Sequence, residues 1–296
     1  MSKKDLIYFA TCSIVWGATW IIVKDQVNHI DPHWSVFLRF FIATIVLLII
    51  IVVRREGFRL NLSSIPIIVT FGIFHFFINF NAVYVAATYL ISGLVAILFA
   101  LLFIPNAIFS YIFLGTRYTI SFYLGSVIAI FGIALLFLDR MPSDLIMRHE
   151  FILGIGFSLA GVLSCSIANV VQASEVAKKL PLIPLLFWSM LIGTFFNFIY
   201  SLLYSGIPDI DISINLVLGL SYLSVIGTVI AFYAYVELTR SIGAPKAAYT
   251  GVIIPIIAML LSSLFEDFEW SFMAVIGSVI ALFGMFFALR ERSRNQ

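Results

Sequence analysis

Several polar side chains recur at helical spacing inside segments that are otherwise apolar. His75 and Asn79 are four residues apart, so they share one face of a helix. Asn81 and Tyr84 form a second polar face in the same segment. Polar groups surrounded by hydrocarbon are costly, and such faces usually turn inward. We interpret them either as the lining of a central cavity or as hydrogen bonds that hold helices together.

Two more polar faces occur in the second half of the chain. Ser166, Asn169 and Gln172 follow one another at intervals of three residues. A narrow stripe in a later segment has four members, Ser221, Ser224, Thr228 and Tyr235. Polar faces on separate helices suggest one shared, water-filled cavity. The alternative is that the serine and threonine residues ease close helix packing.

Aromatic side chains add a possible binding surface. Trp16 and Trp20 are four residues apart, and Lys24 continues their face. Large rings on an inward face suit a flat or apolar ligand. Lys24 is expected to extend to an aqueous interface or to pair with Asp25, and a ligand carboxylate is a further possible partner. Tyr249 is expected to border the cavity.

The sequence lacks the signatures of several enzyme classes. It has no GxxxxGK[ST] loop, no HExxH and no GxSxG. No carboxylate lies in the middle of an apolar segment, so His75 is the one mid-segment candidate for proton coupling. Cys12 and Cys165 both lie in apolar segments and are expected to be reduced and packed. We therefore expect no catalytic centre, no cofactor, no metal site and no nucleic-acid partner.

The composition is that of a membrane protein. Hydrophobic residues make up 62% of the 296 residues, charged residues make up 11%, and the mean hydropathy is +1.12. So few charges could not cover the surface of a soluble protein. Ten apolar segments are long enough to span a bilayer as helices. They are 6–23, 34–53, 65–85, 92–114, 121–138, 151–172, 182–204, 216–239, 247–264 and 270–289.

Loop charges indicate an orientation. Most of the 17 lysine and arginine residues lie on one side of these segments, which the positive-inside rule places in the cytoplasm together with both termini. Arg39, near the start of the second segment, is expected to reach the opposite headgroups.

We predict a multi-pass protein of the cytoplasmic membrane that is a monomer or a homodimer. Its expected partners are the lipid bilayer and a small-molecule substrate.

The chain contains an internal repeat. Residues 125–132 read GSVIAIFG and residues 277–284 read GSVIALFG, and Pro105 and Pro255 recur at nearly the same offset. Five spans per half would make the halves inverted, with repeats at 1–140 and 151–292 and a boundary in 139–150. The predicted fold is all-α, with ten transmembrane helices as two inverted five-helix repeats. The phrase itself is typical of close helix packing, within the fold or across a dimer.

The chain resembles the EamA branch of the drug/metabolite transporter superfamily. The resemblance covers nearly the whole chain and is carried by the motifs WGATW at 16–20, DP at 31–32, RF at 39–40, SGLVAILFALLFIP at 92–105 and AAYTGVIIPIIAMLLSSLFE at 247–266. It implies ten helices and the transport of amino acids, sugars or other metabolites. The family commonly has Gly-Glu after the fourth helix, whereas this chain has Gly115-Thr116, so a role for that glutamate is in doubt.

These observations together favour a secondary transporter that works by alternating access. Pro105 and Pro255 are predicted hinges, and a static kink is the alternative for each. Amino-acid export is the leading expectation, with aromatic or hydrophobic amino acids first. Alternatives are a carrier of sugars, nucleoside- or nucleotide-derived compounds or drug-like compounds, and, less favoured, a channel or a membrane-embedded enzyme.

Overall fold

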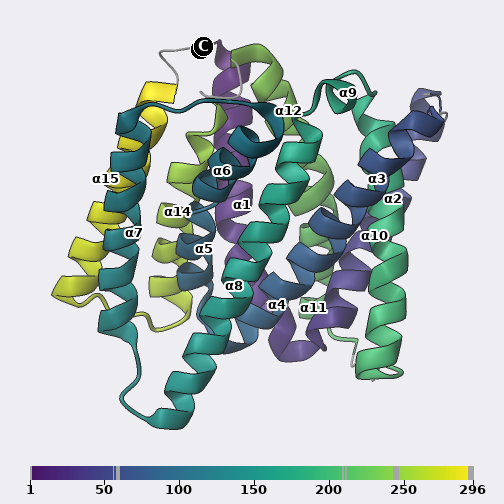
Figure 1. Ribbon diagram of the computed structural model, residues 1–296. Helices are drawn as coiled ribbons and strands as arrows, with labels where there is room; N and C mark the ends of the chain where they lie inside the picture. Colours follow the sequence, from purple (N-terminus) through teal and green to yellow (C-terminus); the bar gives the residue numbers. More distant parts are fainter. Residues whose placement is uncertain are drawn as a thin grey trace.

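The computed structural model describes residues 2–55, 57, 61–208, 210, 212–242 and 247–292, and every regular element within them is helical (Figure 1). The first half contains α1 (Lys3–His29), α2 (Pro32–Arg54), η1 (Leu62–Ser64), α3 (Ile65–Phe71), η2 (Gly72–Asn79), α4 (Phe80–Tyr89), α5 (Ser92–Ala100), α6 (Phe103–Leu114) and α7 (Ile120–Arg140). The second half contains α8 (Leu145–Gln172), α9 (Glu175–Lys178), α10 (Leu182–Ser205), α11 (Ile214–Ser221), η3 (Tyr222–Ile230), α12 (Ala231–Ile242), α14 (Thr250–Phe265) and α15 (Phe272–Arg292).

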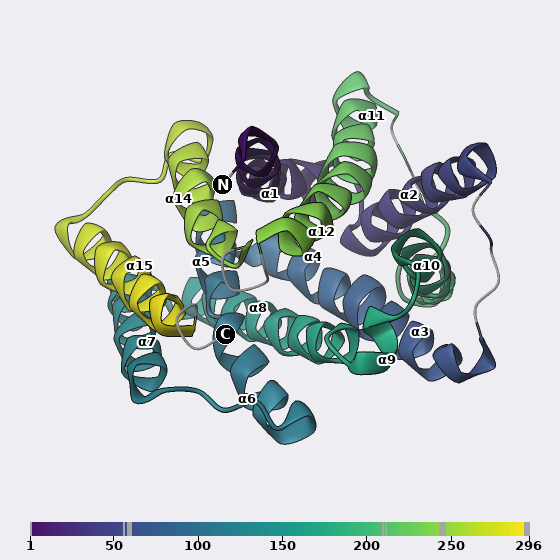
Figure 2. The same ribbon diagram turned by 90° about the horizontal axis from the view of Figure 1, so that it is seen from above.

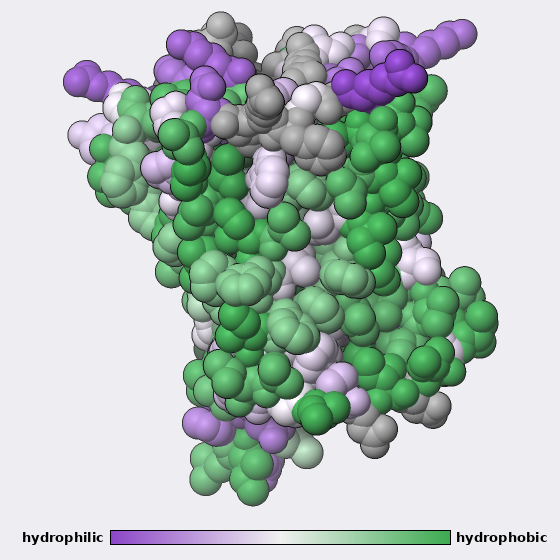
Figure 3. Space-filling model, turned by 90° about the vertical axis from the view of Figure 1, so that its right-hand side faces the viewer, coloured by the Kyte–Doolittle hydropathy of each residue, from purple (hydrophilic) through white to green (hydrophobic). Residues whose placement is uncertain are grey.

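The helices have the length and surface of membrane spans. In the described part of the chain, nine helical stretches are long and apolar enough to cross a bilayer. The helix α14 has 16 residues, and at 1.5 Å per residue it covers about 24 Å of a hydrocarbon layer of roughly 30 Å. A hydrophobic belt lies between hydrophilic ends on the face in Figure 3. The prediction of an all-α, multi-pass membrane protein is confirmed at this level.

Helix boundaries follow local signals. Asp31 caps α2 by accepting hydrogen bonds from the main-chain nitrogens of His33 (2.9 Å) and Trp34 (3.2 Å). Pro32 follows in the first turn, where its missing N–H costs no helical hydrogen bond.

The connection between the halves is shorter than the predicted boundary of 139–150, because α7 ends at Arg140 and α8 begins at Leu145.

The third and eighth spans each contain π-helical turns at their centre. These segments, η2 and η3, begin at Gly72 and Tyr222, close to the offset of the sequence repeat. Such turns are rare in proteins, and those that occur are frequently found at functional sites. In η3 the hydroxyl of Thr228 donates to the main-chain oxygen of Leu223, five residues earlier, at 2.7 Å. The wide turn therefore sets the direction of the Thr228 side chain.

The predicted fourth span, 92–114, is present as Ser92–Leu114, and a short break divides it into α5 and α6. The break falls at Leu101 and Leu102, and Pro105 lies near the start of α6. A proline ring clashes with the carbonyl four residues earlier, here that of Leu101, and supplies no N–H to it. Ile104 bonds that carbonyl instead, at 2.9 Å. Pro255, in contrast, lies within the continuous helix α14.

The two copies of the repeated phrase pack against each other within one molecule. They lie on α7 and α15, which are neighbours at one edge of the bundle (Figures 1 and 2). A Cβ on Gly125 would lie 2.6 Å from the nitrogen of Ala288, and one on Gly277 would lie 2.7 Å from the oxygen of Gly132. Only small residues allow main chains to approach so closely. The numbering of these contacts also means that the two helices run antiparallel.

Candidate functional site in the bundle interior

Arg39 lies in the interior of the bundle, where only 2% of its surface is exposed. At 1.5 Å per residue its Cα is about 10 Å from the start of α2, inside the hydrocarbon layer. Its Nε donates to the hydroxyl of Thr228 at 3.1 Å, and its Nη1 donates to that of Tyr84 at 3.2 Å. The expectation that Arg39 reaches the headgroups is wrong, because these two hydroxyls bind it from neighbouring helices.

The surroundings of Arg39 are neutral. Its guanidinium carbon lies 4.7 Å from the ring centroid of Phe80 and 5.6 Å from that of Phe40, where the π-electron faces favour a cation. The single hydroxyl proton of Thr228 is used on Leu223, so its oxygen is left to accept from Arg39. Among the described residues no carboxylate forms an ion pair with this arginine.

The guanidinium of Arg39 lies close to Gly227. A Cβ built on Gly227 would meet Oγ1 of Thr19 at 3.3 Å, the oxygen of Tyr222 at 3.6 Å and Nη2 of Arg39 at 3.8 Å. Trp16 also contacts Gly227, because its Nε1 donates to the main-chain oxygen of Gly227 at 3.2 Å. Side chains of α1 and α2 therefore meet the main chain of η3 at this point.

An aromatic cluster joins this region to His75. The ring of Trp16 lies 5.6 Å from that of Phe232 and 5.2 Å from that of Tyr235. Phe232 in turn lies 5.6 Å from the His75 ring, edge to face. The predicted site residues Trp16 and His75 are thus connected through Phe232, which was not predicted from the sequence, and Tyr235 joins them through Trp16.

Beyond His75, a chain of polar contacts leads to α8 and α6. The thiol of Cys165 lies 3.8 Å from Nδ1 of His75. Nδ2 of Asn169 lies 3.8 Å from the same sulfur and donates to Oδ1 of Asn106 at 3.4 Å. Three buried polar atoms on η2 and α8 have no hydrogen-bond partner, namely Nε2 of His75, Oδ1 of Asn79 and Oγ of Ser166. Such atoms are rare in native interiors.

Lys24 also turns inward. Its Nζ donates to the main-chain oxygen of Ala87 on α4 at 2.6 Å. The expected pairing with Asp25 is not formed, since Asp25 instead lies 3.7 Å from the ring of His29. The carboxylate of Glu266 accepts hydrogen bonds from the main chain and hydroxyl of Ser92, at the start of α5.

Three predicted site residues lie apart from this contact chain. Trp20 packs on Phe99 of α5, with ring centroids 5.2 Å apart. Tyr249 packs on Phe286 of α15 at 5.8 Å. Gln172 is the half-buried last residue of α8. No hydrogen bond or ring contact within the described ranges joins these three to Arg39 or His75.

A second buried polar network lies between α2, α4 and α10. Nδ1 of His33 is 2.7 Å from Oδ1 of Asn81, and Nδ2 of Asn81 donates to Oδ1 of Asn197 at 2.6 Å. Nδ2 of Asn197 donates to the main-chain oxygen of Phe76 at 2.9 Å. Asn81 and Tyr84, expected on one polar face, therefore belong to different clusters, and His33 and Asn197 were not predicted.

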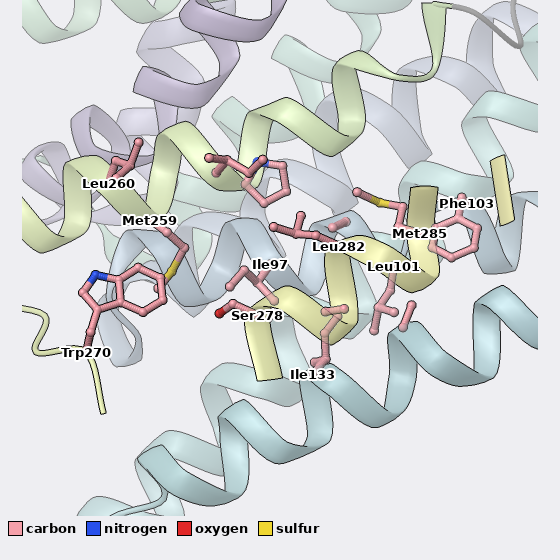
Figure 4. Close-up of a pocket in the computed structure, with 15 residues that line it drawn as sticks. Ile97, Leu101, Phe103, Ile133, Met259, Leu260, Trp270, Ser278, Leu282 and Met285 are labelled. Atoms are coloured by element: carbon pink, nitrogen blue, oxygen red, sulfur yellow. The ribbon is translucent and has the colours of Figure 1, made fainter. Parts of the chain in front are cut away.

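Two cavities differ sharply in character. One, of about 110 Å³, lies between α5, α7, α14 and α15 and is apolar apart from Ser278; its side chains, among them Met259, Trp270 and Met285, are drawn in Figure 4. The other, of about 400 Å³, is open to the surface between α1 and α11 and is lined by Asp25, Tyr222 and their neighbours. The main-chain oxygen of Tyr222 also lies close to Gly227.

Comparison with known proteins identifies relatives over the full length. The model of the EamA-like transporter family matches residues 3–138 and again residues 152–290. An uncharacterized transporter of Archaeoglobus fulgidus is 25% identical, covering 98% of this chain and all of the relative. A probable amino-acid metabolite efflux pump of Escherichia coli K12 is 23% identical, covering 99% of this chain and 98% of the relative. A solved structure, described as "Crystal structure of protein", has a TM-score of 0.71 with 18% identity and covers 100% of both chains, which shows a shared fold.

Proposed function

The chain belongs to the EamA-like transporter family, and from this premise we propose that it is a secondary carrier whose first substrate class is amino acids. It is a multi-pass protein of the cytoplasmic membrane. Export of aromatic or hydrophobic amino acids is the proposed direction and preference. The name of the Escherichia coli relative, a probable amino-acid metabolite efflux pump, supports this choice of class.

One observation carries the proposal: polar and aromatic side chains from both halves meet inside a bundle with an apolar exterior. Arg39 and Tyr84 of the first half meet Thr228 of the second. Trp16 of the first half meets Tyr235 of the second. A binding site between two halves is the arrangement that alternating access requires, because their relative motion then changes the exposure of the site.

The contacts between the halves support an inverted repeat. The approach of Gly125 to the oxygen of Gly284 has a counterpart in the approach of Gly277 to the oxygen of Gly132, as expected for a local two-fold axis between α7 and α15. Away from that pair, the hydroxyls of Thr44 and Thr194, separated by nearly the repeat offset, lie 3.4 Å apart. With this axis in the membrane plane, the halves would have opposite topology, and the positive-inside rule would place both termini in the cytoplasm.

Alternating access also needs places where helices can bend. The paired π-helical turns, η2 and η3, are proposed as one such pair, since they depart from regular α geometry at matched points of the two halves. Pro105 and Pro255 are the second pair, although Pro105 acts at a break and Pro255 within a helix. Both pairs border the helices that carry the interior contacts.

Counterflow into proteoliposomes tests the proposal. Vesicles preloaded with unlabelled L-phenylalanine should accumulate labelled L-phenylalanine in a saturable manner, and Trp16→Ala and Asn169→Ala should abolish accumulation while the protein remains folded. Sugars and nucleosides, tested in parallel, address the alternative substrates. Flux without saturation would indicate a channel, and wild-type rates in both variants would mean that the interior cluster is not the site.

A further inference from the structure

We propose that Arg39 binds the carboxylate of a small organic acid, amino acids included, within the bundle. The inference rests on the proposed carrier function and names the chemical group that its interior site recognises. It favours anionic and zwitterionic substrates over neutral sugars or nucleosides and over cationic drug-like compounds.

The charge of Arg39 has no counter-ion among the residues that the structure describes. A guanidinium has five N–H donors and remains protonated in proteins. In Arg39 the bonds from Nε and Nη1 go to neutral hydroxyls, and Nη2 donates to no residue that the structure describes. Arg140 and Lys178, by contrast, lie 3.2 Å and 2.7 Å from the carboxylates of Asp139 and Glu175. A buried cation without a counter-ion is costly, and a bound anion would offset that cost.

The unpaired nitrogen of Arg39 faces a position without a side chain. Position 227 is a glycine, and a Cβ there would lie 3.8 Å from Nη2 of Arg39, in van der Waals contact. The remaining close atoms are also polar, the Thr19 hydroxyl oxygen and the Tyr222 carbonyl oxygen. Tyr222 also lines a groove of about 400 Å³ that is open to the surface between α1 and α11.

A second cation, Lys24, also contacts α4. Lys24 binds the oxygen of Ala87 and Arg39 binds the hydroxyl of Tyr84, three residues earlier on α4. Residues three apart on a helix are neighbours on its surface. The only carboxylate that interacts electrostatically with Lys24 in the described structure is Glu266, whose oxygens are already hydrogen-bonded to Ser92. The interior therefore presents two cations at neighbouring points of α4.

The competing explanation is that Arg39 only ties α2 to α4 and η3. The two roles differ in their effect on the unliganded protein. A purely structural arginine would lower the apparent Tm when removed, and would leave ligand binding by the folded variant unchanged. For a ligand-binding arginine, the double variant Arg39→Met with Tyr84→Phe removes the charge together with the hydroxyl that would be left unpaired. Its unliganded Tm should stay close to wild type while its response to carboxylates is lost.

The experiment is a thermal-shift series on the purified full-length protein in detergent. The probes are L-phenylalanine, 3-phenylpropanoate, L-phenylalaninamide and 2-phenylethylamine, of which only the first two carry a carboxylate, and the panel extends to all L-amino acids. At saturating concentration a carboxylate ligand should raise the apparent Tm by at least ~2 °C, and its amide or amine analogue should not. The shift should vanish in the double variant and persist in Arg117→Gln, which removes an exposed loop arginine.

The comparison of acid and amide in the wild-type protein tests whether a carboxylate is recognised even if the double variant does not fold. Equal shifts by L-phenylalanine and its amide, or an undiminished carboxylate response in the folded double variant, would overturn the assignment of Arg39. Absence of any carboxylate response in the whole panel would overturn it as well. Saturable counterflow of a neutral or cationic compound in that case would leave the carrier function standing.

Discussion

Two buried polar clusters lie close together in this bundle and are satisfied in opposite ways. Around His33, Asn81 and Asn197, donors and acceptors alternate, and each amide finds a partner within 2.9 Å. Around Arg39 the donors outnumber the acceptors, and the charge has no counter-ion among the described residues. The first arrangement is complete by itself, whereas the second has capacity for one more negatively charged partner.

The difference between the two clusters indicates which polar groups stabilise the fold and which are available to bind a ligand. In hydrocarbon a satisfied network stabilises one arrangement of helices, because breaking it exposes groups that water cannot reach. An unsatisfied cation stores unfavourable free energy that a ligand can relieve. Substitutions in the first cluster should therefore act on stability, and substitutions in the second should act mainly on transport.

The largest effect is expected for Asn81→Leu. The change leaves Nδ1 of His33 and Oδ1 of Asn197 buried without their partners, which should lower the free energy of unfolding by about 2–5 kcal/mol. Chemical unfolding in detergent measures it, with the exposed Asn61→Leu as control. A loss no greater than that of the control would mean that the network does not stabilise the bundle.

Thr228→Val comes next, because it removes the acceptor for Nε of Arg39 and the donor to Leu223. We expect a stability loss of about 1–3 kcal/mol together with a drop in counterflow. Thr228→Ser keeps the hydroxyl and should restore both. Equal transport by the valine and serine variants would show that this hydroxyl does not orient the arginine for binding.

Gly227→Ala should separate the effect on transport from the effect on stability most clearly. The added methyl group enters the space beside Nη2 of Arg39, so counterflow should fall. Stability should change by no more than about 1 kcal/mol, since alanine also favours the helix. Gly156→Ala is the matched control, because nothing lies within 4 Å of a Cβ at that helical position. Unaltered transport in Gly227→Ala would place the ligand elsewhere.

The smallest effect is expected at a pair that belongs to neither cluster. Thr44→Val removes one partner of the contact with Thr194, whose oxygens are 3.4 Å apart, and should cost about 0.5–1 kcal/mol. A double-mutant cycle with Thr194→Val measures the coupling across the proposed two-fold axis. Zero coupling would mean that the contact of Thr44 with Thr194 does not support a two-fold relation between the halves. The α7–α15 contacts would then be the remaining support for that relation.

The sequence was most informative where the cause is local. A long apolar segment must form a helix in hydrocarbon, so the spans were predictable from composition and length alone. The small residues of the repeated phrase likewise predicted close packing, which α7 and α15 display. The span 92–114 was predicted with Pro105 as a hinge or kink within it, and the break at Leu101 and Leu102 lies next to that proline, whose clash with the carbonyl of Leu101 is a local cause.

The sequence was less informative about which polar groups meet. Arg39 was available as a signal, because it is a lone cation inside an apolar segment. Its direction, however, depends on Tyr84 and Thr228, which are distant in the chain and face it only after the helices pack. Asn81 and Tyr84, only three residues apart, contact different helices for the same reason.

The sequence alone determined that this chain is a membrane bundle built from two related halves, because hydrophobic length and repetition are properties of the chain itself. Only the tertiary structure decided which polar residues form a complete hydrogen-bond network and which surround an arginine that has no counter-ion among the described residues. The physical reason is that a side chain's partners are set by helix packing and by the π-helical turns of η2 and η3. Those turns shift the register of a helical face in a way that residue spacing does not reveal.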